Sequence, residues 1–175
     1  KYCDEKQCPY LSGLKNNNYS SKFVKKDEKS IEFFTNKNEI GTVNFCFDRS
    51  CNFQCPSCRS ELINYYGKDR KQVERKLDEI KNEISSTVKR LYLTGTADPF
   101  YSKSFREFLE TLDSKKFTSL ESIHLHTNGS LWNKKMWERV KAIHPYVSSC
   151  EVSIDAGTKE TYETKTRIGG KWDVL

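Results

Sequence analysis

The stretch VNFCFDRSCNFQCPSC, residues 43–58, joins an alternating segment to a group of three cysteines. In its first half the apolar residues Val43, Phe45 and Phe47 alternate with Asn44 and Cys46. This alternation is the pattern of a strand with one buried face. Its second half holds three thiols spaced C-x3-C-x2-C, at Cys51, Cys55 and Cys58. The stretch therefore predicts a strand that leads directly into a cysteine-rich loop.

Three further segments repeat this arrangement of a strand followed by a loop and a helix. The predicted strands are VKRLYLTG (88–95), LESIHLHTNG (120–129) and VSSCEVSID (147–155). Amphipathic spacing predicts helices around 73–84, around 105–112, around Trp132, Met136 and Val140, and over 158–165. Four β–α units in a row predict a parallel sheet with crossover helices.

One face of the predicted sheet is polar, whereas strands buried on both faces are usually apolar on both. The polar positions are Asn44, Cys46, Tyr92, Thr94, His124, His126, Glu151, Ser153 and Asp155. We expect a curved sheet, an open or partial barrel whose concave face lines a cavity, and the alternative is a smaller sheet with one wet face. In the fourth strand we expect Val152 and Ile154 on the apolar face, and we expect Cys46 and Cys150 to be small core or cavity residues.

The loops after the four strands carry the candidate chemistry, because ligands of parallel α/β folds bind at the carboxyl ends of the strands. These loops contain the three cysteines, TGTADPF, HTNG and SIDAGT. A structural zinc site needs four ligands, and no fourth cysteine lies nearby. A 4Fe–4S cluster held by only three thiolates keeps one iron open for a small molecule. The residues alone leave both readings open.

These motifs together resemble the radical S-adenosylmethionine (radical SAM) superfamily over roughly residues 41–175. The resemblance implies that Cys51, Cys55 and Cys58 ligate a 4Fe–4S cluster. It also implies S-adenosylmethionine contacts at Gly95, Ala97, Asp98 and Pro99 after the second strand, Thr127 and Asn128 after the third, Ser153 and Asp155 on the fourth, and Arg167 beyond it. This chain departs from the family pattern in two places. It has Ser57 where the family often has an aromatic residue. In the motif after the second strand it has Asp98 in place of Glu and lacks the family's double glycine.

The resemblance further implies a partial (β/α)6-type barrel of the α/β class, here truncated at the C-terminus because only four or five units are recognisable. We expect residues 39–175 to be this core, and residues 1–38 to be a linker or the tail of a cysteine-rich auxiliary module. Cys3 and Cys8 resemble the end of a SPASM-type module, a cysteine-rich unit that accompanies many radical SAM enzymes.

The implied function is reductive cleavage of S-adenosylmethionine to a 5′-deoxyadenosyl radical, which abstracts hydrogen from a peptide or protein substrate. The implied partner is an electron donor such as flavodoxin or ferredoxin. Two alternatives remain: a zinc-binding module associated with nucleic acid, and a binding domain that keeps the scaffold without catalysis. The residues do not identify a catalytic base, and we read His124 and His126 as cavity-lining residues.

Composition limits the remaining classes. The net charge of +6 comes from lysines mixed with acidic residues along the chain, which favours a solvated surface over a nucleic-acid interface. The sequence contains no apolar run long enough to span a membrane and no visible signal peptide. Its seven cysteines are clustered, unlike a disulfide framework. We therefore expect a cytoplasmic protein with neither a membrane nor a nucleic-acid partner.

Overall fold

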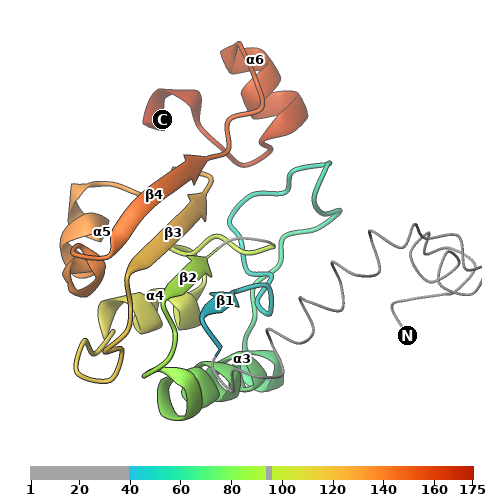
Figure 1. The fold of residues 1–175 in the computed structure, drawn as a ribbon. Coiled ribbons are helices and arrows are strands. Elements are labelled where there is room, and N and C mark those ends of the chain that lie inside the picture. The colour runs from blue at the N-terminus through green and yellow to red at the C-terminus, as the bar shows by residue number, and fades with distance from the viewer. Residues whose placement is uncertain (1–39, 94–95) are drawn as a thin grey trace, which may run out of the picture. The chain divides into compact units, whose positions relative to one another are not determined.

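The computed structural model describes residues 40–93 and 96–175, and Figure 1 shows how their helices and strands are arranged. The predictions for residues 1–38, including those for Cys3 and Cys8, lie outside the described residues, as does the predicted role of Gly95. In the described part of the chain, no helix is both long enough and apolar enough to cross a membrane.

Four parallel strands form one sheet in the order in which they follow along the chain. The strands are β1 (Thr42–Asn44), β2 (Arg90–Leu93), β3 (Ser122–Thr127) and β4 (Val147–Val152). Because every strand pairs in parallel with the next, their carboxyl ends lie at one edge of the sheet, and so do the loops that follow them. The predicted α/β class with parallel strands is confirmed, and the sheet is consistent with a partial barrel.

Helices connect the strands, and Figure 1 shows α3, α4 and α5 on one side of the sheet. Their amphipathic spacing is as predicted, with Val73 and Leu77 buried on α3, and Phe105 and Phe108 on α4. The elements are α3 (Gly67–Glu79) with a π-helical continuation (Ile80–Ile84), α4 (Lys103–Glu110), α5 (Lys134–Arg139) with a 3-10 turn (Lys141–Ile143), α6 (Lys159–Thr161) with a π-helical continuation (Tyr162–Thr166), and a 3-10 turn (Trp172–Val174).

The main core lies between these helices and the apolar face of the sheet. The strands contribute Phe45, just beyond β1, together with Leu91, Leu93, Ile123 and Leu125, all of them at most 1% exposed. The alternation of the first three strands is therefore confirmed. Burial of this apolar area is the main force that stabilises the sheet.

The predicted fourth strand is wrong in extent and in burial. β4 ends at Val152, and Asp155 has a positive φ of 53°, so the extended backbone does not continue to the end of the predicted segment. Val152 and Ile154 are 40% and 39% exposed instead of buried. The register explains this, because Cys150 lies opposite Leu125 and is the β4 residue that packs against the core, along with Val147.

Two smaller predictions also differ from the structure. Cys46 is not a core residue, since its side chain is exposed and its thiol donates to Asn44 Oδ1 at 3.2 Å. The helix predicted around Trp132 begins after that residue, because the Asn133 side chain accepts a hydrogen bond from the Met136 N–H and so caps α5. Trp132 lies in the preceding turn and contacts the ring of Phe100, with the ring centroids 5.6 Å apart.

Candidate metal and cofactor site

The cysteine loop is fastened at its start by a buried carboxylate. Asp48 is 1% exposed; its Oδ1 accepts from the Ser50 N–H at 2.7 Å and its Oδ2 accepts from the Ser102 hydroxyl at 2.5 Å. Ser102 is in turn the N-cap of α4, accepting from the Phe105 N–H at 3.1 Å. The loop that carries the cysteines is therefore tied to the first turn of a helix in the main core.

The middle of the loop packs on the segment that follows α6. The Gln54 N–H donates to the Ile168 carbonyl at 2.8 Å. Phe53, Cys55 and Tyr162 form a second, small buried cluster, in which the rings of Phe53 and Tyr162 meet edge to face. Phe53 therefore faces this cluster and is not available for stacking on an adenine ring.

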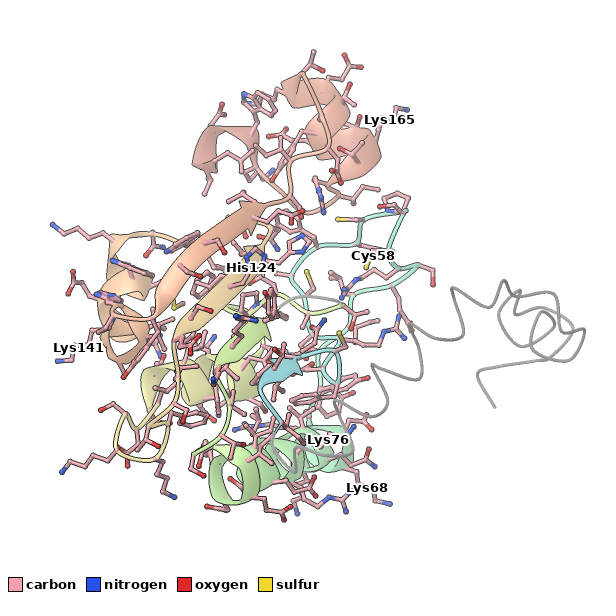
Figure 2. All side chains as sticks on the ribbon, viewed as in Figure 1. Cys58, Lys68, Lys76, His124, Lys141 and Lys165 are labelled. Atoms are coloured by element: carbon pink, nitrogen blue, oxygen red, sulfur yellow. The ribbon has the colours of Figure 1, made fainter. Side chains whose placement is uncertain are left out.

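Each of the three thiols receives a side-chain N–H donor. Asn128 Nδ2 lies 3.6 Å from Cys51 Sγ, Arg167 Nη1 lies 3.5 Å from Cys55 Sγ, and Arg59 Nη2 lies 3.4 Å from Cys58 Sγ. Figure 2 shows Cys58 on the loop between β1 and α3. Two of the three donors are guanidinium groups, so this side of the protein is prepared for negatively charged sulfur.

Burial disfavours the thiolate form of Cys51. Burial raises the pKa of Cys51 above its ordinary value of 9.0, and the Asp98 carboxylate adds to the rise, while the Phe53 N–H, Arg59 and Asn128 oppose it. A metal ligand must be a thiolate, so binding at Cys51 has to displace a proton.

Asp98 is the residue that joins the loops after β2 and β3. Its side chain is 2% exposed, and its Oδ1 accepts from the backbone N–H groups of Phe100 and Tyr101 at 3.0 Å each. Its Oδ2 accepts from the Thr127 hydroxyl at 2.7 Å and from the Asn128 N–H at 2.9 Å. The carboxylate is therefore satisfied by four protein donors, and its role in the site is to hold two loops together.

A second set of hydrogen bonds joins the loop after β3 to the cysteine loop. Asn128 Nδ2 donates to Asn52 Oδ1 at 2.9 Å, and Asn52 Nδ2 donates to Ser130 Oγ at 2.9 Å. Ser130 Oγ donates to Asn128 Oδ1 at 2.6 Å, which closes a ring of three side chains. The loops after β1, β2 and β3 are thus positioned by one another.

These loops surround a cavity of about 320 Å³ at the carboxyl ends of the strands. It is lined by Cys51, Ser57, Cys58, Arg59, Thr96, Ala97, Asp98, His126, Thr127, Asn128, Glu151, Ser153, Asp155 and Arg167. Of the predicted site residues, Pro99 and Cys55 are buried behind this lining, although Cys55 contacts Arg167. The structure thus brings most of the predicted residues around one space.

The far wall of the cavity comes from β3, β4 and the segment after β4. His126 Nε2 lies 2.6 Å from Ser153 Oγ and 3.8 Å from Glu151 Oε1. Arg167 forms an ion pair with Asp155. Glu151 was expected on the polar face that lines the cavity, and it lies there. Sequence reasoning gave no cofactor role to Arg59, although its position next to the third cysteine was a signal that pointed to it.

The surroundings of the three thiols fit a cluster held by cysteine sulfurs, because each sulfur has a side-chain N–H donor within 3.6 Å. Among residues 40–93 and 96–175, no group of three or more His, Cys, Asp or Glu side chains is arranged to hold a single metal ion. Thiolates that accept N–H hydrogen bonds, with a buried guanidinium beside them, are the environment by which proteins hold and tune iron–sulfur clusters.

Comparisons with known proteins agree with this site. The family model of the Radical SAM superfamily matches residues 46–175. Over 98 residues the chain is 30% identical to 7-carboxy-7-deazaguanine synthase of Aquifex aeolicus (strain VF5). The alignment covers 55% of this chain and 40% of the relative, so the chain spans less than half of that protein's length. The family's cofactors are a 4Fe–4S cluster and S-adenosylmethionine, and the chain belongs to the radical SAM superfamily of enzymes.

Proposed function

We propose that the chain is the core of an enzyme that cleaves S-adenosylmethionine reductively at a cluster held by Cys51, Cys55 and Cys58. The observation that carries this proposal is the set of three thiols, each with an N–H donor within 3.6 Å, beside one polar cavity at the strand ends. When bound, the cluster supplies one electron to the sulfonium compound, which yields methionine and a 5′-deoxyadenosyl radical that abstracts hydrogen from the substrate.

The protein's own contribution is to hold the thiols and to shape the cavity. Asp48 and Asp98 fasten the loops from below, so the polar groups at the cavity wall keep their positions without the cofactor. A site that is already organised loses less conformational entropy when it binds its ligand.

We assign the S-adenosylmethionine contacts to polar groups that line the cavity: Ala97, Thr127, Asn128, Ser153, Asp155 and Arg167. Arg167 is a cation of the cavity lining that could receive a carboxylate, and in this structure it pairs with Asp155. Binding of the methionine moiety at Arg167 therefore requires this ion pair to be shared or exchanged. Asp98, with its carboxylate fully bonded, contributes by positioning, and the buried Pro99 contributes through the course of the backbone. The contact proposed for Gly95 lies outside the described residues.

The partner and the substrate follow from the same reaction. One-electron reduction requires a donor, and we propose a protein of the flavodoxin or ferredoxin kind. The proposed peptide or protein substrate and the auxiliary module before residue 39 rest on Cys3 and Cys8, which lie outside the described residues. The matched relative is named for a deazaguanine product, so it lends no support to a peptide substrate.

Anaerobic reconstitution with iron and sulfide tests the proposal. The chain is expected to take up about four irons in the site and to turn brown, as the cluster stoichiometry requires. With a strong reductant it is expected to convert S-adenosylmethionine to methionine and 5′-deoxyadenosine, measured by chromatography. Cys55→Ala should lose both properties.

The matched control is Cys46→Ala, which removes an exposed thiol outside the cysteine loop and should retain both. Cleavage retained by Cys55→Ala would refute the assignment. A colourless protein with one zinc per chain would favour the zinc alternative, and a cluster without cleavage would favour the binding domain.

A further inference from the structure

Arg59 is a buried cation without an ion-pair partner in the part of the chain that the structure describes. The residue is 8% exposed and lines the cavity. Its Nη1 donates to the Arg49 carbonyl at 2.6 Å, and its Nη2 donates to the Thr96 carbonyl and lies 3.4 Å from Cys58 Sγ. Carbonyl oxygens satisfy the N–H groups but carry only partial charge, and no carboxylate of the described residues forms an ion pair with this cation.

The second arginine of the site differs in this respect. Arg167 also donates to a cysteine sulfur, but its charge is balanced by the Asp155 carboxylate. An uncompensated buried cation is costly, and proteins keep one where an anion is to be bound. The neighbour that can carry a negative charge is the thiolate of Cys58 and, through it, the cluster.

We propose that Arg59 is the fixed counter-charge of the cluster and raises its reduction potential. The inference rests on the proposed function, because it needs the cluster at Cys51, Cys55 and Cys58. Reduction adds one negative charge to the cluster, and a cation 3.4 Å from a ligand sulfur stabilises the reduced form more than the oxidised form. Arg59 contacts the sulfur of Cys58 and acts on the reaction only through the cluster, so we class it as a positioning residue.

The contacts of Arg59 also fix its place. The guanidinium bridges the residue before the cysteine loop, at Arg49, and the loop after β2, at Thr96. Its distance from Cys58 is thus set by two backbone carbonyls on either side. A lysine at this position keeps the charge but has a single nitrogen, which cannot span all three acceptors in the same way.

The test is a redox titration of the reconstituted chain, followed by electron paramagnetic resonance of the reduced cluster. Arg59→Met is expected to lower the ratio of reduced to oxidised cluster about tenfold at a fixed solution potential, which is a shift of about 59 mV for one electron. The reduction potential of Arg59→Lys is expected to lie between those of Arg59→Met and the unchanged chain. Arg49→Met is the matched control, because Arg49 is exposed and only its backbone carbonyl takes part, so the potential should not move.

The outcomes separate this inference from the proposed function. A chain with unaltered sequence that takes up no four-iron cluster defeats the proposed function. A cluster that forms but titrates identically in Arg59→Met and in the unaltered chain defeats the role of Arg59 alone. If Arg59→Met is folded but loses iron, retention of iron by Arg59→Lys supports the counter-charge, and loss of iron from both variants overturns it.

Discussion

The two apolar clusters of the protein differ in size and in what completes them. The main cluster contains eighteen buried residues between the sheet and its helices, whereas the cluster under the cysteine loop contains only Phe53, Cys55 and Tyr162. In the small cluster, the Tyr162 hydroxyl and the neighbouring Arg167 Nε are buried without a hydrogen-bond partner among the described residues. The sheet therefore rests on extensive apolar packing, whereas the segment under the cysteine loop has a small core and two polar atoms that are unpartnered in the described part of the chain.

The largest effect is expected in the main cluster. Leu125 is fully buried at the centre of β3, and Leu125→Ala should lower the free energy of unfolding by about 2–5 kcal/mol. Urea denaturation followed by circular dichroism measures this loss. Val152→Ala is the control on the neighbouring strand, because Val152 is 40% exposed and its truncation should lower the free energy of unfolding far less. Equal losses at the two positions would mean that the main cluster is not what holds the sheet.

A smaller effect is expected at Asp98, the carboxylate that joins the loops after β2 and β3. Asp98→Asn replaces an acceptor of four hydrogen bonds by an amide whose NH₂ group faces donors, which should cost about 1.5–3 kcal/mol. The same urea denaturation measures it. Asp173→Asn, which removes an exposed ion pair with Lys159, should leave stability nearly unchanged, because solvent screens exposed pairs. A harmless Asp98→Asn would show that the loops are held by other contacts.

Overpacking the cluster of Phe53, Cys55 and Tyr162 should destabilise only the region around the cysteine loop. A Cβ at Gly170 would lie 2.6 Å from Tyr162 Cε1 and 3.0 Å from Phe53 Cε2, so Gly170→Ala should cost about 1–3 kcal/mol. Hydrogen exchange should accelerate in residues 50–58 and stay slow in β2 and β3. Gly157→Ala is the control, because nothing lies within 4 Å of a Cβ there. Acceleration spread over the whole sheet would show that the two clusters unfold as one.

The smallest effect concerns the unpartnered hydroxyl. Tyr162→Phe removes only that group, and in the metal-free protein it should change stability by less than about 1 kcal/mol, towards greater stability. Burial raises the pKa of Tyr162 above its ordinary value of 10.0, so the contribution of the neutral form is complete below pH 10 and is lost as the pH rises through the folded pKa. Between pH 8 and pH 11 the denaturation midpoint of the unaltered chain should therefore fall more steeply with rising pH than that of Tyr162→Phe. Parallel profiles would contradict this.

The sequence was sufficient to predict the sheet, because apolar alternation reports directly which face of a strand is buried. Leu91, Leu93, Ile123 and Leu125 lie on the buried face as expected. Parallel order then placed the four loops at one edge without further information. Alternation does not report whether another element covers a strand, and for that reason the burial of Val152 and Ile154 was predicted wrongly.

The side-chain roles within the site were less accessible to sequence reasoning. The four bonds of Asp98 and the ring of Asn52, Asn128 and Ser130 join loops that are far apart in the chain, and Asn128 lies 76 positions after Asn52. Arg59 gave a signal through its position next to Cys58, but its lack of a charged partner depends on the packing of three segments. Such relations follow only from the folded arrangement, and the assigned cofactor contacts stay predictions.

The sequential pairing of the strands has a consequence for biosynthesis. Each strand pairs with the one made just before it, so the sheet can grow as the polypeptide leaves the ribosome. Phe53 and Cys55, by contrast, acquire their packing partner only when Tyr162 has been translated. We therefore expect Cys55 to stay accessible until the segment around Tyr162 has been synthesised and has packed on the cysteine loop.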